Sequence, residues 1–184
     1  MPDFSRAVSL ACHDLRTPLA TVTGFAKTLA RSEALDERSS RYVRLIDAAA
    51  DQMAGLLDEL GRLARIEGGR YEPGLVAVDT RDLATSPDER VAVTGEGTEI
   101  DTDAPAVRHA LAALARAAAS HGGIGRVTWT VHGRELELAP VTADAAPVVL
   151  ADDPKDFGAL VGRRVIEALG GAVTLDGETL HVRL

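Results

Sequence analysis

Residues 4–29 read FSRAVSLACHDLRTPLATVTGFAKTL, and the apolar residues in this stretch recur in alternating steps of four and three. The repeat, called the apolar seam below, comprises Phe4, Val8, Ala11, Leu15, Pro18, Val22, Phe25 and Leu29. Steps of this kind place side chains on one side of an α-helix that packs along another helix. The stretch therefore predicts a long amphipathic helix, which we expect to begin after a capping Asp3 and to end near Arg31.

A second helix is predicted after a polar break over residues 32–36, where Asp36 can cap the first turn. Its apolar positions recur in the same steps, at Tyr42, Ile46, Ala49, Met53, Leu56, Leu60 and Leu63. Two amphipathic helices with a short connection form an antiparallel hairpin. One hairpin leaves an apolar flank exposed, because Leu19, Leu45 and Leu57 lie beside the seams, so we expect a homodimer.

His13 occupies the position farthest from the apolar seam, which predicts that its imidazole faces solvent. Thr17 lies one helical turn further along on the same face. Asp14 can accept a hydrogen bond from the imidazole and fix the tautomer that leaves the other ring nitrogen free to attack. Pro18 has no N–H to donate, so we expect the helix to bend there. A lone exposed histidine is usually an idle surface residue, but these four residue types at these offsets favour a catalytic site.

The heptapeptide HDLRTPL at residues 13–19 resembles the H-box of bacterial two-component histidine kinases of the HisKA type. Residues 56–69 are similar to the end of the second helix of that family. The resemblance implies that His13 accepts a phosphoryl group and that Asp14 assists the transfer. It implies that Thr17 helps to position water when the family acts as a phosphatase. It also implies that the hairpin dimerises into a four-helix bundle.

Four residues near His13 are candidates for contact with a protein partner. Arg16 can offset negative charge on the phosphoryl oxygens. Gly24 lies in the interior of the predicted helix, where a glycine costs about 1 kcal/mol relative to alanine. Either this glycine is a tolerated imperfection, or together with Ala20 and Thr21 it leaves a shallow surface onto which another helix docks.

The composition excludes several classes of function. A hydrophobic content of 46% with 26% charged residues is typical of a globular protein, and no apolar run approaches the ~20 residues of a membrane span. A net charge of -8 argues against nucleic acid as the main partner. The single cysteine, Cys12, excludes an internal disulfide and is expected to be a small packed residue. We see no signal peptide and expect a cytoplasmic protein without a membrane partner.

Glycines at 68 and 69 and a Pro-Gly pair at 73 and 74 divide the chain into a helical domain, residues 1–69, and a second domain, residues 70–184. Helices are predicted in the second domain over residues 81–84, 104–119 and 156–169. Short strands are predicted over residues 75–78, 91–94, 126–131, 135–138, 148–150, 172–175 and 180–184. The fold class is therefore a helical hairpin followed by a small α/β sandwich.

Residues 163–173, RRVIEALGGAV, are similar to the closing helix and the next strand of the GHKL-type ATPase domain of histidine kinases. The nucleotide chemistry differs. Arg116 stands where the family has its metal-binding asparagine, and an arginine cannot ligate Mg²⁺ because it offers only donors and a positive charge. No Asp-x-Gly-x-Gly occurs over residues 136–156, and the later glycine-rich turn at residues 156–159 keeps one glycine. The sequence therefore predicts a degenerate GHKL-like domain that binds no cofactor and no metal.

Together these features predict a histidine phosphotransferase of a bacterial phosphorelay. It would be similar to the dimeric phosphotransfer proteins that keep a kinase-like fold but have lost ATP binding. The expected partners are response-regulator receiver domains and a hybrid histidine kinase, with Mg²⁺ held by the receiver. Two alternatives stay open: an ATP-dependent sensor histidine kinase with a divergent nucleotide site, and a non-catalytic pseudokinase that binds a response regulator.

Overall fold

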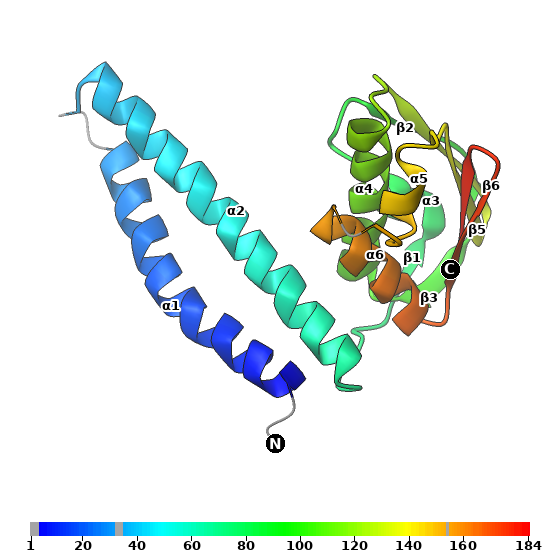
Figure 1. Ribbon diagram of the computed structural model, residues 1–184, viewed down its shortest axis with the longest axis horizontal. Helices are drawn as coiled ribbons and strands as arrows, with labels where there is room; N and C mark the ends of the chain where they lie inside the picture. Colours follow the sequence, from blue (N-terminus) through cyan, green and yellow to red (C-terminus); the bar gives the residue numbers. More distant parts are fainter. Residues whose placement is uncertain (1–3, 32–34, 154) are drawn as a thin grey trace. The chain divides into compact units, whose positions relative to one another are not determined.

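The computed structural model describes residues 4–31, 35–153 and 155–184 and divides the chain into two compact units, Met1–Arg70 and Tyr71–Leu184. The first unit is a helical hairpin, and the second is a layer of strands with helices on one face (Figure 1). The predicted fold class, a helical hairpin followed by an α/β sandwich, is thereby confirmed. The expected cap Asp3 and residues 32–34 of the expected break lie outside the described residues.

The hairpin consists of α1 (Phe4–Ala30) and α2 (Glu37–Glu67). Asp36 caps α2 as predicted, because its carboxylate accepts a hydrogen bond of 2.6 Å from the backbone N–H of Ser39. This hydrogen bond lowers the pKa of Asp36. Among the described residues, no helix combines the length and the hydropathy that crossing a bilayer requires.

The face that joins the two helices is not the predicted apolar seam. Small and medium side chains that are at most 7% exposed lie there: Cys12, Ala26, Val43, Ala50 and Ala64. Residues of the seams are open to solvent instead, with exposed fractions of 53% at Leu15, 67% at Phe25 and 49% at Met53. The predicted packing of the seam along another helix is therefore not made within one hairpin, because the smaller residues allow the closer approach there. Cys12 is buried, as the sequence predicts.

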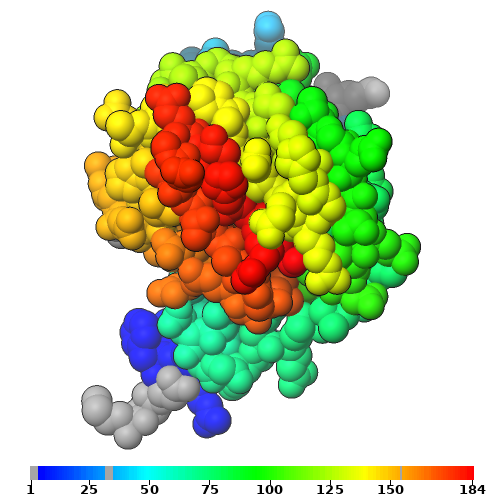
Figure 2. All heavy atoms as spheres, turned by 90° about the vertical axis from the view of Figure 1, so that its right-hand side faces the viewer, coloured from blue at the N-terminus to red at the C-terminus, as the bar shows by residue number. Residues whose placement is uncertain are grey.

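The second unit contains a five-stranded sheet in the order β2-β4-β5-β7-β6 and a separate antiparallel pair, β1 with β3. The strands are β1 (Val76–Asp79), β2 (Val91–Gly97), β3 (Glu99–Thr102), β4 (Val127–Gly133), β5 (Glu135–Ala139), β6 (Ala172–Asp176) and β7 (Thr179–Arg183). In the large sheet β2 is parallel to β4, and the other neighbours are antiparallel. Its outer face lies open at the surface of the unit (Figure 2).

The helices of this unit lie on the inner face of the sheet (Figure 1). They are α3 (Thr80–Ala84), α4 (Ala104–His121), α5 (Ala146–Val149) and α6 (Phe157–Ala168). Trp129 of β4 and Leu114 of α4 are fully buried between the two layers. The helices α4 and α6 approach closely, since a Cβ on Gly162 would lie 3.1 Å from the Cα of Ala110. Apolar burial between the sheet and the helices therefore holds this unit together.

Two elements differ from the sequence prediction. Residues 148–150 are not a strand; they belong to α5 and the residue after it, and the N–H of Val149 bonds to the carbonyl oxygen of Ala145 at 3.0 Å. Pro147 at the start of α5 favours a first helical turn over a strand. The strand β3 was not predicted, because its four residues Glu-Ile-Asp-Thr give a weak alternation with buried Ile100 and Thr102.

Candidate functional site

His13 lies in the middle of α1, and its side chain is 77% exposed, as its distance from the apolar seam predicts. Its Nδ1 lies 3.1 Å from Oδ1 of Asp14. A carboxylate can only accept, so Nδ1 of the neutral ring carries the proton in this hydrogen bond. The other nitrogen, Nε2, then keeps a free lone pair, which is the state that a nucleophilic imidazole requires.

The turn after His13 carries Thr17 and Pro18. Thr17 is exposed, and its carbonyl oxygen accepts a hydrogen bond of 3.3 Å from the hydroxyl of Thr21. Pro18 lies inside α1 without ending it. Because a proline has no N–H, it cannot supply the intrahelical donor for the carbonyl oxygen of Asp14. The helix backbone beside His13 is therefore less tightly bonded than the rest of α1.

Arg16 contacts the second helix of the hairpin. Its Nε and Nη2 both donate to Oδ1 of Asp58, at 3.2 Å and 2.7 Å. The two side chains remain 44% and 65% exposed, so water screens this ion pair strongly. The predicted role of Arg16 is to offset charge on a phosphoryl group at His13. In that role its guanidinium group would be shared between Asp58 and the phosphoryl group.

Three residues of α2 that the sequence analysis did not single out lie beside these groups: Asp58, Gly61 and Arg65. Gly61 is buried, and a Cβ built on it would lie 3.6 Å from Nη2 of Arg16 and 3.7 Å from Nη1 of Arg65. The same point lies 3.9 Å from the Cβ of Cys12. The spacing of three and four residues, which places Asp58, Gly61 and Arg65 on one helix face, was the available signal.

Ala20, Thr21 and Gly24 lie exposed on α1 beyond His13. A Cβ built on Gly24 would meet no atom within 4 Å, so the helix surface is open there. The hydroxyl of Thr28 donates to the carbonyl oxygen of Gly24 at 2.8 Å. These positions are compatible with the expected shallow docking surface, and the docking role itself stays a prediction.

In the second unit, Arg116 extends from α4 toward the first residues of α6. Its Nη2 lies 3.0 Å from the position that a Cβ on Gly158 would take, and Oδ1 of Asp156 lies 3.3 Å from the same point. Asp156 caps α6 by accepting a hydrogen bond of 2.9 Å from the N–H of Ala159. Its other oxygen, Oδ2, lies 3.6 Å from Nε2 of His121. Ionisable side chains of this chain, Arg116, Asp156 and His121, therefore lie around the beginning of α6.

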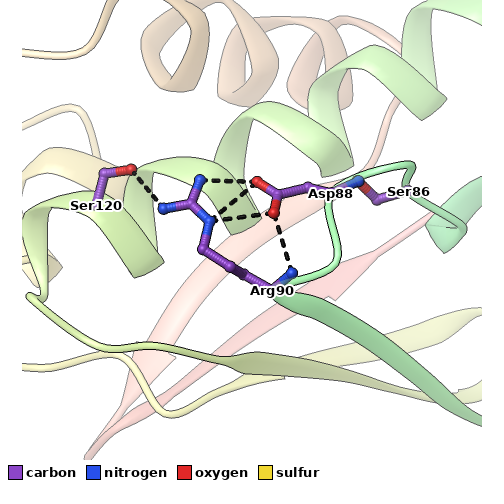
Figure 3. Close-up of polar contacts among 4 residues, drawn as sticks. All are labelled: Ser86, Asp88, Arg90 and Ser120. Carbon is purple, nitrogen blue, oxygen red and sulfur yellow. Dashed lines mark hydrogen bonds and ion pairs between the residues drawn. The ribbon is translucent and has the colours of Figure 1, made fainter.

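A second cluster of polar and charged side chains joins the segment before β2 to the end of α4 (Figure 3). Nη2 of Arg90 donates to Oδ2 of Asp88 at 2.7 Å, and Nη1 of Arg90 donates to the hydroxyl of Ser120 at 3.4 Å. The hydrogen bonds from Arg90, with a smaller contribution from the charge of Arg116, lower the pKa of Asp88 to about 2. These contacts fasten the segment before β2 to α4.

Residues 5–69 match the family model described as the His Kinase A (phospho-acceptor) domain. The chain is 33% identical over 88 residues to Sensor protein DivL of Caulobacter vibrioides, covering 48% of this chain and 11% of that protein. It is 26% identical over 184 residues to Histidine protein kinase DivJ of the same organism, covering 91% of this chain and 30% of that protein. The chain thus spans less than a third of the length of either relative.

Two solved structures have a similar fold. Full-length ShkA in complex with AMPPNP has a TM-score of 0.68 and 23% identity, and the likeness covers 96% of this chain and 44% of that chain. The Acinetobacter baumannii histidine kinase AdeS has a TM-score of 0.56 and 17% identity, with 94% and 96% covered. The likeness extends over both units, so the order of a helical hairpin and an α/β domain is shared with these proteins.

Proposed function

We propose that this chain, which is related to two-component histidine kinases and carries a HisKA domain at residues 5–69, is a histidine phosphotransferase of a phosphorelay. The observation that carries the proposal is the exposed imidazole of His13, held by Asp14 in the tautomer whose Nε2 can attack. In this proposal His13 relays a phosphoryl group between aspartates of two receiver domains.

In the first step the lone pair of Nε2 of His13 attacks the phosphorus of an aspartyl phosphate. The N–P bond forms as the bond from phosphorus to the carboxylate oxygen breaks, and that electron pair returns to the aspartate of the receiver. The ring gains a positive charge, which Asp14 offsets through the hydrogen bond from Nδ1–H. Transfer to the second receiver reverses these events. The chain supplies orientation and charge balance, which are the main needs of a loose phosphoryl transition state.

Arg116 supports a phosphoryl donor other than ATP. A guanidinium group beside Gly158 and Asp156 puts a positive charge at the start of α6, next to the turn at residues 156–159 that resembles the glycine-rich turn of the GHKL family. The positive charge of Arg116 repels Mg²⁺, and an arginine has no lone pair with which to bind a metal. In our proposal the Mg²⁺ ion of the reaction is therefore bound by the acidic pocket of the receiver, where it offsets charge on the phosphoryl oxygens.

The partners follow from the two exposed surfaces of the hairpin. The open apolar side chains of the seams support a homodimer, in which a second hairpin covers them and completes a four-helix bundle. The exposed surface at Ala20, Thr21 and Gly24 supports docking of a receiver helix beside His13. Thr17, on the same side, would position water when the phosphoryl group is hydrolysed.

The test is phosphoryl uptake from a labelled, phosphorylated receiver domain, compared with uptake from labelled ATP and Mg²⁺ without a receiver. We expect acid-labile label from the receiver and none from ATP. His13→Gln should abolish uptake, and His132→Gln, a matched change at another exposed histidine, should not. Label from ATP alone would replace this proposal with an autokinase. Absence of label from both donors would replace it with a scaffold that binds a response regulator.

A further inference from the structure

We propose that Arg65 of α2 and Arg16 of α1 act as a pair that binds the phosphoryl group while it is transferred to and from His13. The two residues are called the arginine pair below. This inference rests on the proposed phosphotransfer function and adds to it a second helix that takes part in the chemistry. Both guanidinium groups lie over Gly61, which has no side chain between them.

The evidence for this inference is that the guanidinium groups of Arg16 and Arg65 both lie next to Gly61. One guanidinium nitrogen of Arg16 and one of Arg65, from different helices, come within 3.7 Å of the point where a Cβ of Gly61 would lie. Cys12, the residue before His13, lies 3.9 Å from that point. Gly61 therefore lies level with the turn of α1 that carries His13. Arg16 is one helical turn from His13.

Charge explains why such an arrangement favours an anionic ligand. Two cations that approach the same point repel each other, and Asp58 accepts both of its hydrogen bonds from Arg16 through one oxygen. The arginine pair with Asp58 thus has one positive charge in excess. Phosphoryl oxygens are the group that arginine recognises best, because its planar fork offers two parallel N–H donors. The transferred group would relieve the repulsion and would draw Arg16 away from Asp58.

Single-turnover phosphotransfer from a phosphorylated receiver to the full chain tests this inference. In Arg65→Gln we expect the maximal rate at saturating receiver to fall about tenfold to a hundredfold, the usual size for loss of a charge-assisted hydrogen bond in a transition state. The receiver concentration that gives half of the maximal rate should stay unchanged. Arg65→Lys should recover part of the rate, since it restores the charge but not the fork. The matched control is Arg44→Gln, an exposed arginine far from Gly61 on the same helix.

A second pair of variants leaves both arginines in place. Gly61→Asp puts a carboxylate between the guanidinium groups, and Gly61→Asn has nearly the same shape without the charge. A Cβ fits there at ordinary contact distances of 3.6–3.9 Å, so both chains should fold, which circular dichroism checks. Because the carboxylate occupies the arginine pair, we expect transfer to be about tenfold slower in Gly61→Asp than in Gly61→Asn.

The outcomes separate this inference from the function on which it rests. If the wild-type chain takes up no label from any receiver, the proposed function fails. If wild type and Arg65→Gln transfer at the same rate, the arginine pair has no part in the chemistry. If Arg65→Gln raises only the half-saturating receiver concentration, Arg65 contacts the receiver surface instead of the phosphoryl group. Either of the last two results overturns the inference and leaves the function standing.

Discussion

A single charge in the apolar seam of α2 should separate the proposed dimer. On one hairpin the seams stay open, with Leu56 at 45% and Met53 at 49% exposed although both are apolar. Contiguous apolar surface of this kind marks a site of association. In the proposed four-helix bundle these side chains lie at the contact between the two copies, so Leu56→Arg places a guanidinium group at that contact.

The size of the effect follows from the exposed fraction. Complete burial of a leucine side chain contributes about 1.5–3 kcal/mol, and Leu56 is 45% exposed on the hairpin, so about 1 kcal/mol per copy remains to be gained in the dimer. Partial desolvation of an unpaired guanidinium that can still reach toward water adds about 1–2 kcal/mol per copy. A two-fold symmetric dimer contains the change twice, so the loss is about 4–6 kcal/mol, or roughly three to four orders of magnitude in Kd.

Sedimentation velocity or light scattering over a dilution series measures this change. We expect a dimer for the wild type and a monomer for Leu56→Arg at tens of micromolar, with helicity retained. The matched control is Ala48→Arg, which introduces the same side chain at an exposed alanine outside the seam of the same helix. A wild-type monomer at tens of micromolar, or an intact dimer in Leu56→Arg, would refute the reasoning.

Three further predictions concern other parts of the chain. Because Arg116 stands where the resemblance to the GHKL family expects a metal-binding asparagine, millimolar ATP with Mg²⁺ should leave the melting temperature unchanged; bound ligand at one hundred times its Kd would add about 2.7 kcal/mol and raise it by several degrees. The pKa of Asp88 is about 2 in the folded chain and higher when unfolded, so its contribution to stability is present above about pH 4 and is lost as the pH falls toward 2. Wild type should therefore lose more stability than Asp88→Asn between pH 5 and pH 2, as followed by the fluorescence of the single, fully buried Trp129, and equal losses would contradict this. Asp58→Asn should change the free energy of unfolding by less than about 1 kcal/mol in urea titrations, since the ion pair is exposed, and a larger loss would show a structural role.

The sequence predicted the helices of the hairpin but not which faces they share. Periodicity identifies an amphipathic helix and its apolar side, and here it found the strongest row of large residues, such as Leu15 and Phe25. The two helices of one chain instead meet through Cys12, Ala26 and Ala50, which are nearly or fully buried. A repeat of small residues beside a repeat of large ones leaves open which of the two packs within a chain. Only the arrangement of both helices in space resolves it.

In the second unit the long elements were predictable, whereas two of the short ones, α5 and β3, were not. The helix α4 has a continuous alanine-rich pattern with a proline in its first turn, and it was predicted to within two residues at its end. The elements α5 and β3 have four residues each, which is too few to establish the hydrophobic period of a helix, 3.6, or of a strand, 2. The structure of such a segment depends on the element with which it pairs. The strand β3, for example, pairs with β1.

The candidate site shows the same division between local and tertiary information. His13, Asp14 and Thr17 lie within five residues of one another, and the geometry of one helix was enough to predict that the imidazole is exposed. Arg65 and Gly61 come from the other helix, and their place beside Arg16 depends on the register of the hairpin, which the sequence did not provide. Residues that act together from different elements are therefore the ones that a search for motifs overlooks.

The proposed nucleophile and the proposed loss of nucleotide binding depend on different residues, so one can persist while the other changes. Every contact described for His13 and its neighbours, including those with Asp14 and between Arg16 and Asp58, is made within the hairpin. The charged groups around Arg116 lie within the second unit. The contacts described for Arg116 therefore do not involve the hydrogen bond between His13 and Asp14. In the proposed function, an exposed imidazole with a free Nε2 accepts a phosphoryl group from a donor that reaches it in line, so a receiver domain would take the place of ATP without any change at the acceptor.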